Sequence, residues 1–413
     1  MIKETVCLKE KKVSLSITNS EISAILRSNT TKSGIRIYEN DCLGIAGALG
    51  DYDDNDLTNK AKHMLKFKLP YTAAPAANID NALDLSGELA ISDEDFVKTC
   101  RELLAELSSK FPQFMLTHKM ELLENETSIN NTAGVNLSQK DRYLQLVLVM
   151  KYRQSKNLMD AYGVYVARSL DYKTTFDALS RTICAYEQKA DFTDQKIPVI
   201  VSNVWGLGSI FANELNGNVF GTGASLWAGK IGEKLFNDKF SLYVDRNAKK
   251  TRQTFFDGEG VVLPDDKFAL IENGVLKSPY TTKMIAKQFN LPISGSAGLV
   301  YDAASGASPM SLAAGESEKT LKELLGGKQG IYIESASGGD FTPQGEFASP
   351  IQTAYFFDGD KLCGRLPQMA MSGNVTDMFG KDFIGVANHG AYPGDSDRYH
   401  VIEMDVKKIG DWT

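Results

Sequence analysis

The placement of glycine in the second half of the chain constrains the fold more than any other feature. Many of the 35 glycines of this 413-residue sequence lie in three stretches, GSAGLVYDAASGAS, ESASGGDFTPQGEFA and GVANHGAYPGDSD. Asn273-Gly274 and Asp358-Gly359 each separate two strand-like runs, and such dipeptides are typical of two-residue hairpin turns. Helical patterns are few and short, at residues 209–215, 226–236, 283–289 and 316–325. These features predict a β-rich, barrel-like second half without alternating β-α-β units.

The first half mixes hairpins with well-marked helices. In GIRIYENDCLGIAGALG, apolar and polar residues alternate ahead of Glu39-Asn40-Asp41, which predicts a hairpin that turns at those residues. Helices are expected in DNDLTNKAKHMLKFKL and KTTFDALSRTICAYEQKA, and strands in FMLTHKMELLENE, RYLQLVLVMKYR and AYGVYVARSLDY. The segment DFTDQKIP has the character of a linker. We therefore expect an α+β fold, with an N-terminal domain of hairpins and helices at residues 1–192 and a C-terminal β-rich domain at residues 193–413.

The segment SDEDFVKTCRELLAELSSKF carries the clearest helix pattern of the chain. Ser92 precedes the helix and Asp95 follows three residues later, a variant of the capping box. Six apolar residues then recur at helical spacing: Phe96, Val97, Cys100, Leu103, Leu104 and Leu107. This stripe is expected to face the core.

Bulk composition excludes several classes of protein. The net charge of -7 leaves no basic footprint for nucleic acid. Five cysteines without a CxxC pair argue against a disulfide framework and for a reducing compartment. No run approaches the ~18 apolar residues of a membrane span, and the start of the chain lacks the apolar region of a secretory signal. We expect a cytoplasmic protein that binds neither nucleic acid nor membrane.

The stretch IPVIVSNVWGLGSIFANELNGN has the outline of a dinucleotide site, with Gly206 and Gly208 ahead of a helix that contains Ala212. A dinucleotide fold also needs an acidic residue about 20 positions further on, at the end of a second strand. That zone reads GASLWAGKIGEK, which has a helical pattern. The sequence therefore predicts no bound cofactor.

Candidate catalytic groups are sparse. The chain has no GxSxG elbow and no HExxH pair. Of its four histidines, His63, His118 and His400 lie in regular segments and are expected to be structural. His389 lies in the loop NHGAYPGD, where a side chain can face a cleft, so Asn388 and His389 are retained as candidate cleft residues.

Several segments of the second half, taken in order, resemble the TldD/PmbA family. They are FFDGEGV, LIENGVLKSPYTTKMIAKQFNLPISGSAG, IYIESASGGDFTPQGEFA and GNVTDMFG, and the similarity extends through most of residues 199–405. SGIRIYENDCLGIAGA is similar to the N-terminal hairpin of the family. The resemblance implies one of two roles. A TldD-like member binds zinc through a His-Glu-x-x-x-His helix and a C-terminal cysteine and is a peptidase, whereas a PmbA/TldE-like member lacks these ligands and pairs with the first in a heterodimer.

The departures from the zinc motif favour the second role. GNVFGTGAS resembles the segment that follows the zinc helix, which places the helix motif at residues 208–213. Gly208 and Asn213 then stand at the histidine positions and Ser209 stands at the glutamate position. The C-terminal cysteine is also missing, and Ala387-Asn388-His389 occupies its neighbourhood. These residues predict a chain without a metal and without catalytic residues, inactive as a peptidase on its own.

The resemblance implies a TldD-like zinc metalloprotease subunit as partner and unfolded peptides as substrate, with a homodimer as a further option for the isolated chain. Gly338, Gly339, Asp340 and Phe341 form a candidate peptide-binding segment that could add an extended peptide to a strand edge. The competing interpretation is that these glycines only serve tight turns. Since the family is also called "modulator of DNA gyrase", an alternative function is regulation of the gyrase system through protein contacts.

Overall fold

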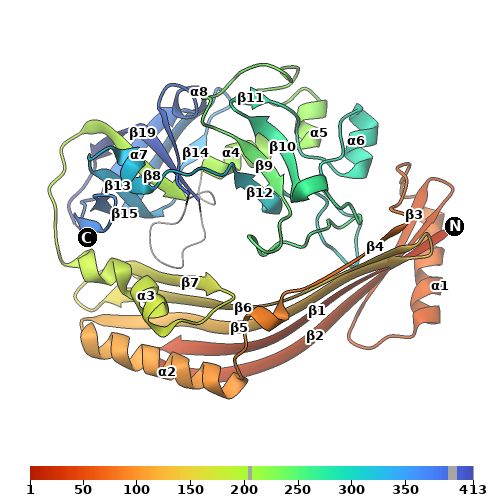
Figure 1. The fold of residues 1–413 in the computed structure, drawn as a ribbon, viewed down its shortest axis with the longest axis horizontal. Helices are drawn as coiled ribbons and strands as arrows, with labels where there is room; N and C mark the ends of the chain where they lie inside the picture. The colour runs from red at the N-terminus through yellow and green to blue at the C-terminus, as the bar shows by residue number, and fades with distance from the viewer. Residues whose placement is uncertain (203–206, 389–397, 413) are drawn as a thin grey trace.

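The structure is a computed structural model that describes residues 1–202, 207–388 and 398–412. Figure 1 shows the first half of the chain as a long curved sheet at the base of the molecule, with the second half above it. None of the helices within the described residues combines the length and the apolar character that a membrane crossing requires.

The sheet of the first half is built from unusually long strands. Its order is β3-β2-β1-β5-β6-β4, with β7 also paired to β6. Neighbouring strands are antiparallel, except that β4 runs parallel to β6. The strands are β1 (Ile2–Thr18), β2 (Glu21–Glu39), β3 (Cys42–Leu49), β4 (Ile79–Asp84), β5 (Phe114–Asn131), β6 (Val135–Tyr152) and β7 (Ala161–Ala167). The predicted turn between β2 and β3 is confirmed, with Asn40 and Asp41 in the left-handed conformation.

Three α-helices and two short 3₁₀ turns accompany this sheet. They are α1 (Asp54–Met64), η1 (Leu65–Phe67), η2 (Ser86–Glu88), α2 (Asp93–Lys110) and α3 (Tyr172–Tyr186). Ser92 caps α2 as predicted, because its side chain accepts a hydrogen bond from the Asp95 amide. All six residues of the predicted apolar stripe are buried, and α2 packs with α3 on one face of the sheet.

The second half forms a closed barrel and a smaller sheet. In the barrel, β8 (Gln195–Ser202), β19 (Tyr399–Lys408), β17 (Met369–Asn374), β15 (Glu346–Phe357) and β13 (Gly330–Ala336) follow one another, and β13 pairs with both β15 and β8 to close the ring. Shorter strands extend it: β14 (Asp340–Phe341), β16 (Leu362–Arg365) and β18 (Phe383–Val386). The smaller sheet has the order β11 (Val275–Leu276), β10 (Lys267–Glu272), β9 (Leu242–Asp245) and β12 (Leu312–Ala314). The predicted α+β fold with a barrel-like C-terminal part is confirmed.

The helices of the second half are short and agree only partly with the sequence patterns. They are α4 (Leu207–Glu214), α5 (Gly217–Gly221), η3 (Pro264–Asp266), α6 (Lys283–Phe289), η4 (Pro309–Ser311), α7 (Leu321–Leu325) and α8 (Val375–Met378). The helix expected at residues 226–236 is wrong, because Gly229 and Gly232 adopt positive φ and the segment runs through turns. The helix expected at 316–325 begins only after Thr320, which closes a capping box with Glu323.

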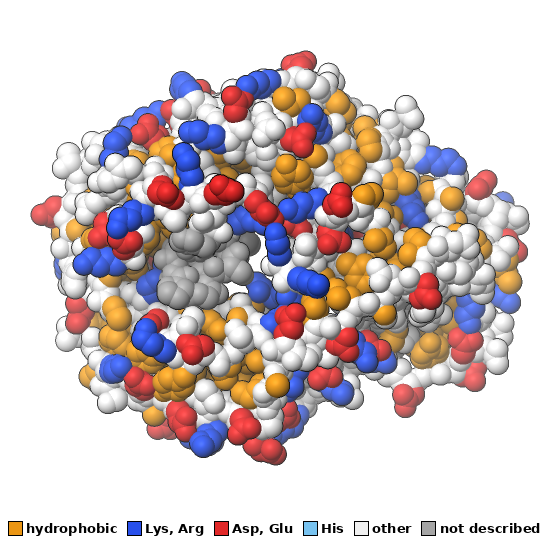
Figure 2. All heavy atoms as spheres, viewed as in Figure 1, with side chains coloured by type: hydrophobic (Ala, Val, Ile, Leu, Met, Phe, Trp, Pro, Cys, Tyr) orange, Lys and Arg blue, Asp and Glu red, His pale blue; other side chains and the backbone are white. Residues whose placement is uncertain are grey.

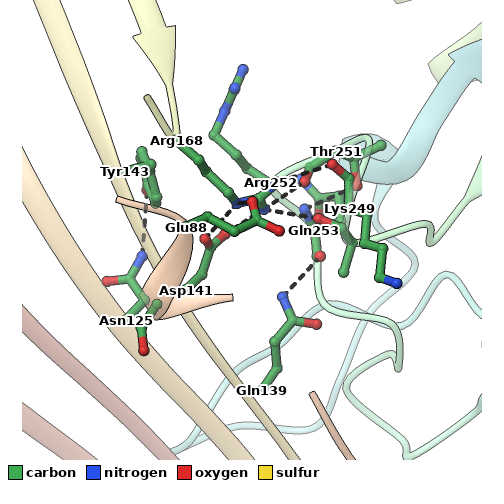
Figure 3. A network of polar contacts seen from close by, with 12 residues as sticks. Glu88, Asn125, Gln139, Asp141, Tyr143, Arg168, Lys249, Thr251, Arg252 and Gln253 are labelled. Carbon is green, nitrogen blue, oxygen red and sulfur yellow. Dashed lines mark hydrogen bonds and ion pairs between the residues drawn. The ribbon is translucent and has the colours of Figure 1, made fainter. Parts of the chain in front are cut away.

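The two halves meet at buried polar contacts as well as apolar ones. Figure 3 shows Arg168, which follows β7, reaching the loop after β9. Its guanidinium donates to both carboxylate oxygens of Asp141 at 2.6 Å and to the carbonyls of residues 248, 249 and 251. Gln139 donates to the carbonyl of Gln253 beside this cluster. The planar guanidinium suits this site because it can serve a carboxylate and several carbonyls at once.

Candidate functional site

Helix α4 contains the residues at which the family resemblance places a zinc-binding helix. It follows barrel strand β8, and its inward face is held in the core by Ile210 and Phe211. The ring of Phe211 stacks on Trp227 at 5.3 Å between centroids and meets Phe379 edge-on at 4.7 Å. Aromatic packing of this kind leaves the short helix little freedom to rotate.

Helix α4 carries the three residues at which the family resemblance places the zinc motif, and two of them are exposed. Ser209 and Asn213 are exposed and Gly208 is half-buried. Residues 209 and 213 are four apart, so they share one face of the helix. A glycine offers no side-chain donor to a metal, and zinc in proteins is held by cysteine, histidine and carboxylate groups. A hydroxyl and an amide on this face do not fit the zinc ion that the family resemblance implies for a TldD-like member.

The one carboxylate of α4 is buried beside this face. Glu214 is 7% exposed, and its Oε2 accepts a hydrogen bond of 2.6 Å from the Leu226 amide. Its Oε1 accepts a second bond of 2.7 Å from Asn213 Nδ2. Glu214 therefore secures the turns that follow α5. In the sequence, the only sign of this burial is that Glu214 follows the apolar residues of the helix.

The C-terminal end of α4 is tied to the segment SPYTT. Tyr280 Oη donates to the carbonyl of Ala212 at 2.6 Å, and the Tyr280 amide donates to the carbonyl of Leu215. Asn216 caps α5 through the Asn218 amide and also contacts Tyr280 Oη. The segments that resemble the family thus hold the backbone around α4 in place.

Asn388 is the only described member of the candidate cleft pair, since His389 lies outside the described residues. Asn388 is exposed, and its amide and Nδ2 donate to the carbonyls of Lys319 and Glu318. None of the hydrogen bonds among the described residues joins it to α4. The structure therefore places Asn388 at the approach to α7 and leaves a role in a cleft as a prediction.

The glycines of the candidate peptide-binding segment have clear conformational tasks. Gly338 adopts φ of +87°, and a Cβ at Gly339 would lie 2.3 Å from the Cβ of Ser349. Asp340 and Phe341 form β14 against β15, with the Phe341 ring 4.7 Å from that of Phe347. β14 ends the order of the barrel sheet, so its outer edge has no strand partner among the described residues. The glycines serve the turn and the close packing, and the Phe341 amide of β14 donates to Asp340 Oδ1 at 2.8 Å.

The DGEG segment joins the second half to the first. Asp257 accepts hydrogen bonds from the amides of residues 259, 261 and 297, which holds the turn in shape. The carbonyl of Gly258 accepts a bond of 2.6 Å from the Arg36 guanidinium of β2. Glu259 accepts from Tyr71 Oη and from the Lys283 amide. The carboxylates of this acidic segment therefore serve structural hydrogen bonds.

Burial raises the pKa of Glu259 to about 7 from 4.5, with the nearby Asp257 carboxylate as the second cause. Between these two values the folded chain keeps a proton that the unfolded chain has released, so the stability that depends on this group falls as the pH rises. We expect Glu259→Gln to flatten that fall by roughly 1–3 kcal/mol. Urea unfolding below pH 4.5 and above pH 7 gives the change in the free energy of unfolding between these conditions. Glu233→Gln, at an exposed glutamate, is the control. An unchanged pH dependence in Glu259→Gln would refute the assignment.

The three histidines that the structure describes, His63, His118 and His400, lie outside α4. His63 and His118 are exposed. His400 is buried among the rings of Phe240, Phe379 and Phe383, and burial lowers its pKa to about 4. Within residues 1–202, 207–388 and 398–412, no three histidine, cysteine or acidic side chains are grouped so that they could hold a metal ion.

Figure 2 shows a hollow between the sheet of the first half and the body of the second half. In the view of Figure 1, α4 and β14 are drawn on the upper side of this region and β7 on the lower side. The exposed face of α4 and the open edge of β14 belong to elements that share one hydrophobic core.

Comparisons with known proteins agree with this architecture. Residues 194–397 match the PmbA/TldA metallopeptidase C-terminal domain. No curated protein matches the chain. Among solved structures, TldE from Thermococcus kodakarensis is similar with a TM-score of 0.81 at 17% identity, covering 99% of this chain and 97% of that one. A protein from Thermotoga maritima, named as a proposed modulator of a DNA gyrase, has a TM-score of 0.78 at 17% identity, covering 98% of this chain and 96% of that one.

A third structure, from Bacteroides thetaiotaomicron and also named as a proposed modulator of DNA gyrase, gives a TM-score of 0.77 at 16% identity, with 99% and 95% covered. These three similarities establish the fold over nearly the whole chain. Together with the domain match over residues 194–397, they support the assignment of the chain to the TldD/PmbA family.

Proposed function

We propose that this chain is the metal-free, non-catalytic subunit of a TldD/PmbA-type heterodimeric zinc metalloprotease that processes or degrades unfolded peptides. One observation carries the proposal: α4 exposes Ser209 and Asn213 beside half-buried Gly208, and the helix's own carboxylate, Glu214, is buried and hydrogen-bonded. Water activation by zinc needs three protein ligands and a nearby base. In this proposal a TldD-like partner supplies all of them.

The role of this subunit is to position substrate and to support the partner. An extended peptide would lie along the outer edge of β14, beside exposed Asp340 and half-buried Phe341, and would replace the bond that the Phe341 amide donates to Asp340 Oδ1. Because a two-residue strand contributes few hydrogen bonds, it suits weak and sequence-tolerant capture. We propose residues 338–341 as the peptide-binding segment on this ground, together with Asn388 and His389 as residues of the cleft.

Two further proposals concern the setting of the protein. All five cysteines are free thiols in the structure, which supports a reducing compartment such as the cytoplasm. Residues 1–192 and 193–413 are proposed as the two domains, since the change from the long sheet to the barrel falls between α3 and β8. The names of two structural neighbours motivate a second candidate function, regulation of DNA gyrase through protein contacts.

The test is reconstitution with a TldD-like protein from the same genome. We expect the chain alone to leave an unfolded peptide intact, the two proteins to copurify as a complex, and cleavage by the complex to exceed that by the TldD-like protein alone. Robust cleavage by the isolated chain would contradict the proposal. Failure to associate with any TldD-like protein, together with binding to gyrase, would favour the second candidate.

A further inference from the structure

A pocket of about 560 Å³ lies at the end of the long sheet where β1 turns into β2. Its walls come from the turn at residues 19–22, from α2, and from residues near the start of β5 and the end of β6. Leu104 and Phe114 are 2% and 1% exposed and give it an apolar floor. None of its described lining residues belongs to the second half, and Figure 1 draws α2 on the side of the sheet away from the second half. The pocket is therefore separate from the hollow between the two halves.

Two guanidinium groups line this pocket with donors that the fold does not use. Among the described residues, the Arg101 side chain makes no hydrogen bond or ion pair. The Arg153 side chain makes one bond there, from Nε to the carbonyl of Pro112 at 3.0 Å. Glu21 is the only acidic residue among the described residues of the lining. Because arginine commonly binds a carboxylate through two parallel N–H donors, the pocket fits one carboxylate next to an apolar group.

An open strand edge begins at this pocket. β3 covers β2 only at residues 32–39, so residues 22–30 have no strand on their outer side among the described residues. The Gly50 amide donates to the carbonyl of Thr31, so the main-chain groups of Thr31 point outward. This direction alternates along an antiparallel strand, and the register of β2 with β1 is regular from residue 24 onward. The amides and carbonyls of residues 25, 27 and 29 therefore point outward as well.

Helix α2 flanks this edge. An ion pair of 3.4 Å between Arg27 and Asp93 joins β2 to the start of the helix, whereas Ile22 and Leu104 meet at the pocket. The strand from Ile22 to Arg27 and the helix from Asp93 to Leu104 are both roughly 17 Å long, so the two elements run side by side in opposite directions. Ile25 is 42% exposed and lies on the same face of the sheet as the helix. A chain added to this edge can pack against Ile25 and the side of α2.

We propose that the pocket and the open edge of β2 bind the C-terminal end of an extended peptide. The peptide carboxylate lies between Arg101 and Arg153, and the last side chain lies on the apolar floor. The preceding residues of the peptide add a strand antiparallel to β2. A small apolar carboxylate would also fit the pocket, but only a peptide uses the outward main-chain groups of the edge. This site does not rest on the proposed protease function, and it is distinct from the segment at residues 338–341.

Fluorescence anisotropy with the full chain tests the site. The probe is a short peptide of alternating threonine and valine that carries a dye at its N-terminus and ends in leucine with a free carboxylate. We expect this probe to bind saturably. The same peptide with a C-terminal amide is expected to bind about tenfold more weakly or worse, because the bonds between guanidinium and carboxylate are lost.

Three variants separate the pocket from its surroundings. Arg101→Gln is expected to weaken binding of the carboxylate peptide about tenfold and to leave binding of the amide peptide unchanged. Lys98→Gln is the matched control, since Lys98 is exposed on the same helix and is not part of the lining, and its affinity should equal that of the wild type. Ala105→Phe fills the pocket from an exposed position and should abolish binding. Urea unfolding verifies that each variant is folded.

Hydrogen exchange distinguishes a peptide from a small carboxylate as the occupant. The carboxylate peptide is expected to slow exchange at the outward amides of residues 25, 27 and 29, whereas N-acetyl-leucine should leave them unchanged. Binding of the peptide without this protection would overturn the strand pairing and leave a site for small carboxylates only.

Three other results would overturn the site itself. They are the absence of saturable binding to the wild-type chain, equal affinities for the carboxylate and amide peptides, and an Arg101→Gln variant that binds the carboxylate peptide as tightly as Lys98→Gln does.

Discussion

Replacing Arg36 by alanine is expected to lower the free energy of unfolding by about 3–5 kcal/mol, because it leaves a buried carboxylate without its partner. Arg36 and Glu4 are 2% and 1% exposed, and their side chains pair at 3.2 Å. The same guanidinium donates to the carbonyls of Gly258 and Val300 and to Ser305 Oγ at 2.6, 2.8 and 3.1 Å. It therefore fastens the DGEG segment of the second half onto β2 of the first.

Urea unfolding of the full chain measures this loss. Lys3→Ala is the matched control, since its exposed ion pair with Asp54 is expected to contribute about 0–1 kcal/mol. In the double variant Glu4→Gln, Arg36→Ala the unpaired charge is gone, so part of the loss should be recovered. A loss in Arg36→Ala no greater than that in Lys3→Ala would show that the guanidinium does not hold the two halves together.

Phe211→Ala is expected to cost about 3–5 kcal/mol, as is usual for deleting a buried aromatic ring. Phe211 is 3% exposed. Its ring lies within 5.8 Å of those of Trp227, Phe236, Phe240 and Phe379, centroid to centroid. Truncation leaves a cavity beneath α4, and because these rings come from three separate segments the helix loses its anchorage as well as its burial.

The same unfolding experiment applies, with Leu158→Ala as the control because that side chain is 87% exposed. In addition, the amides of residues 207–215 should exchange faster with solvent in Phe211→Ala. If stability and exchange both match those of the control, the aromatic cluster is not what positions α4.

Local patterns in the sequence predict elements whose residues interact with near neighbours. The helix at residues 93–110 is an example, because its cap and its apolar stripe lie within one segment. The Asn273-Gly274 hairpin is another, since Asn273 and Gly274 both adopt the positive φ that the turn needs. The length of β1 and β2 is not predictable in this way. The charged stretch of β1 at residues 9–12 is held in strand conformation by pairing with residues 28–31 and 123–126, far apart in the chain.

In the candidate site, too, features set by near neighbours in the chain are predictable and features set by distant residues are not. The positions of Gly208, Ser209 and Asn213 on one short helix follow from the resemblance and from the helix pattern, and the structure places them on α4. The burial of Glu214 depends on its hydrogen bond with the amide of Leu226, twelve residues later. That residue begins a segment in which the sequence pattern predicts a helix that does not form. Likewise, the contacts of DGEG cannot be predicted locally, because its carboxylates accept hydrogen bonds from the amides of residues 259 and 283 and from Tyr71 Oη of the first half.

The zinc content of the purified chain tests the central claim most directly. After incubation with zinc and removal of loosely held metal, mass spectrometry is expected to find far less than one zinc per chain. Ser209→Ala, Asn213→Ala and His389→Ala should leave that value unchanged. One tightly held zinc per chain that any of these variants removes would contradict the account, because this chain would then carry a metal site of its own.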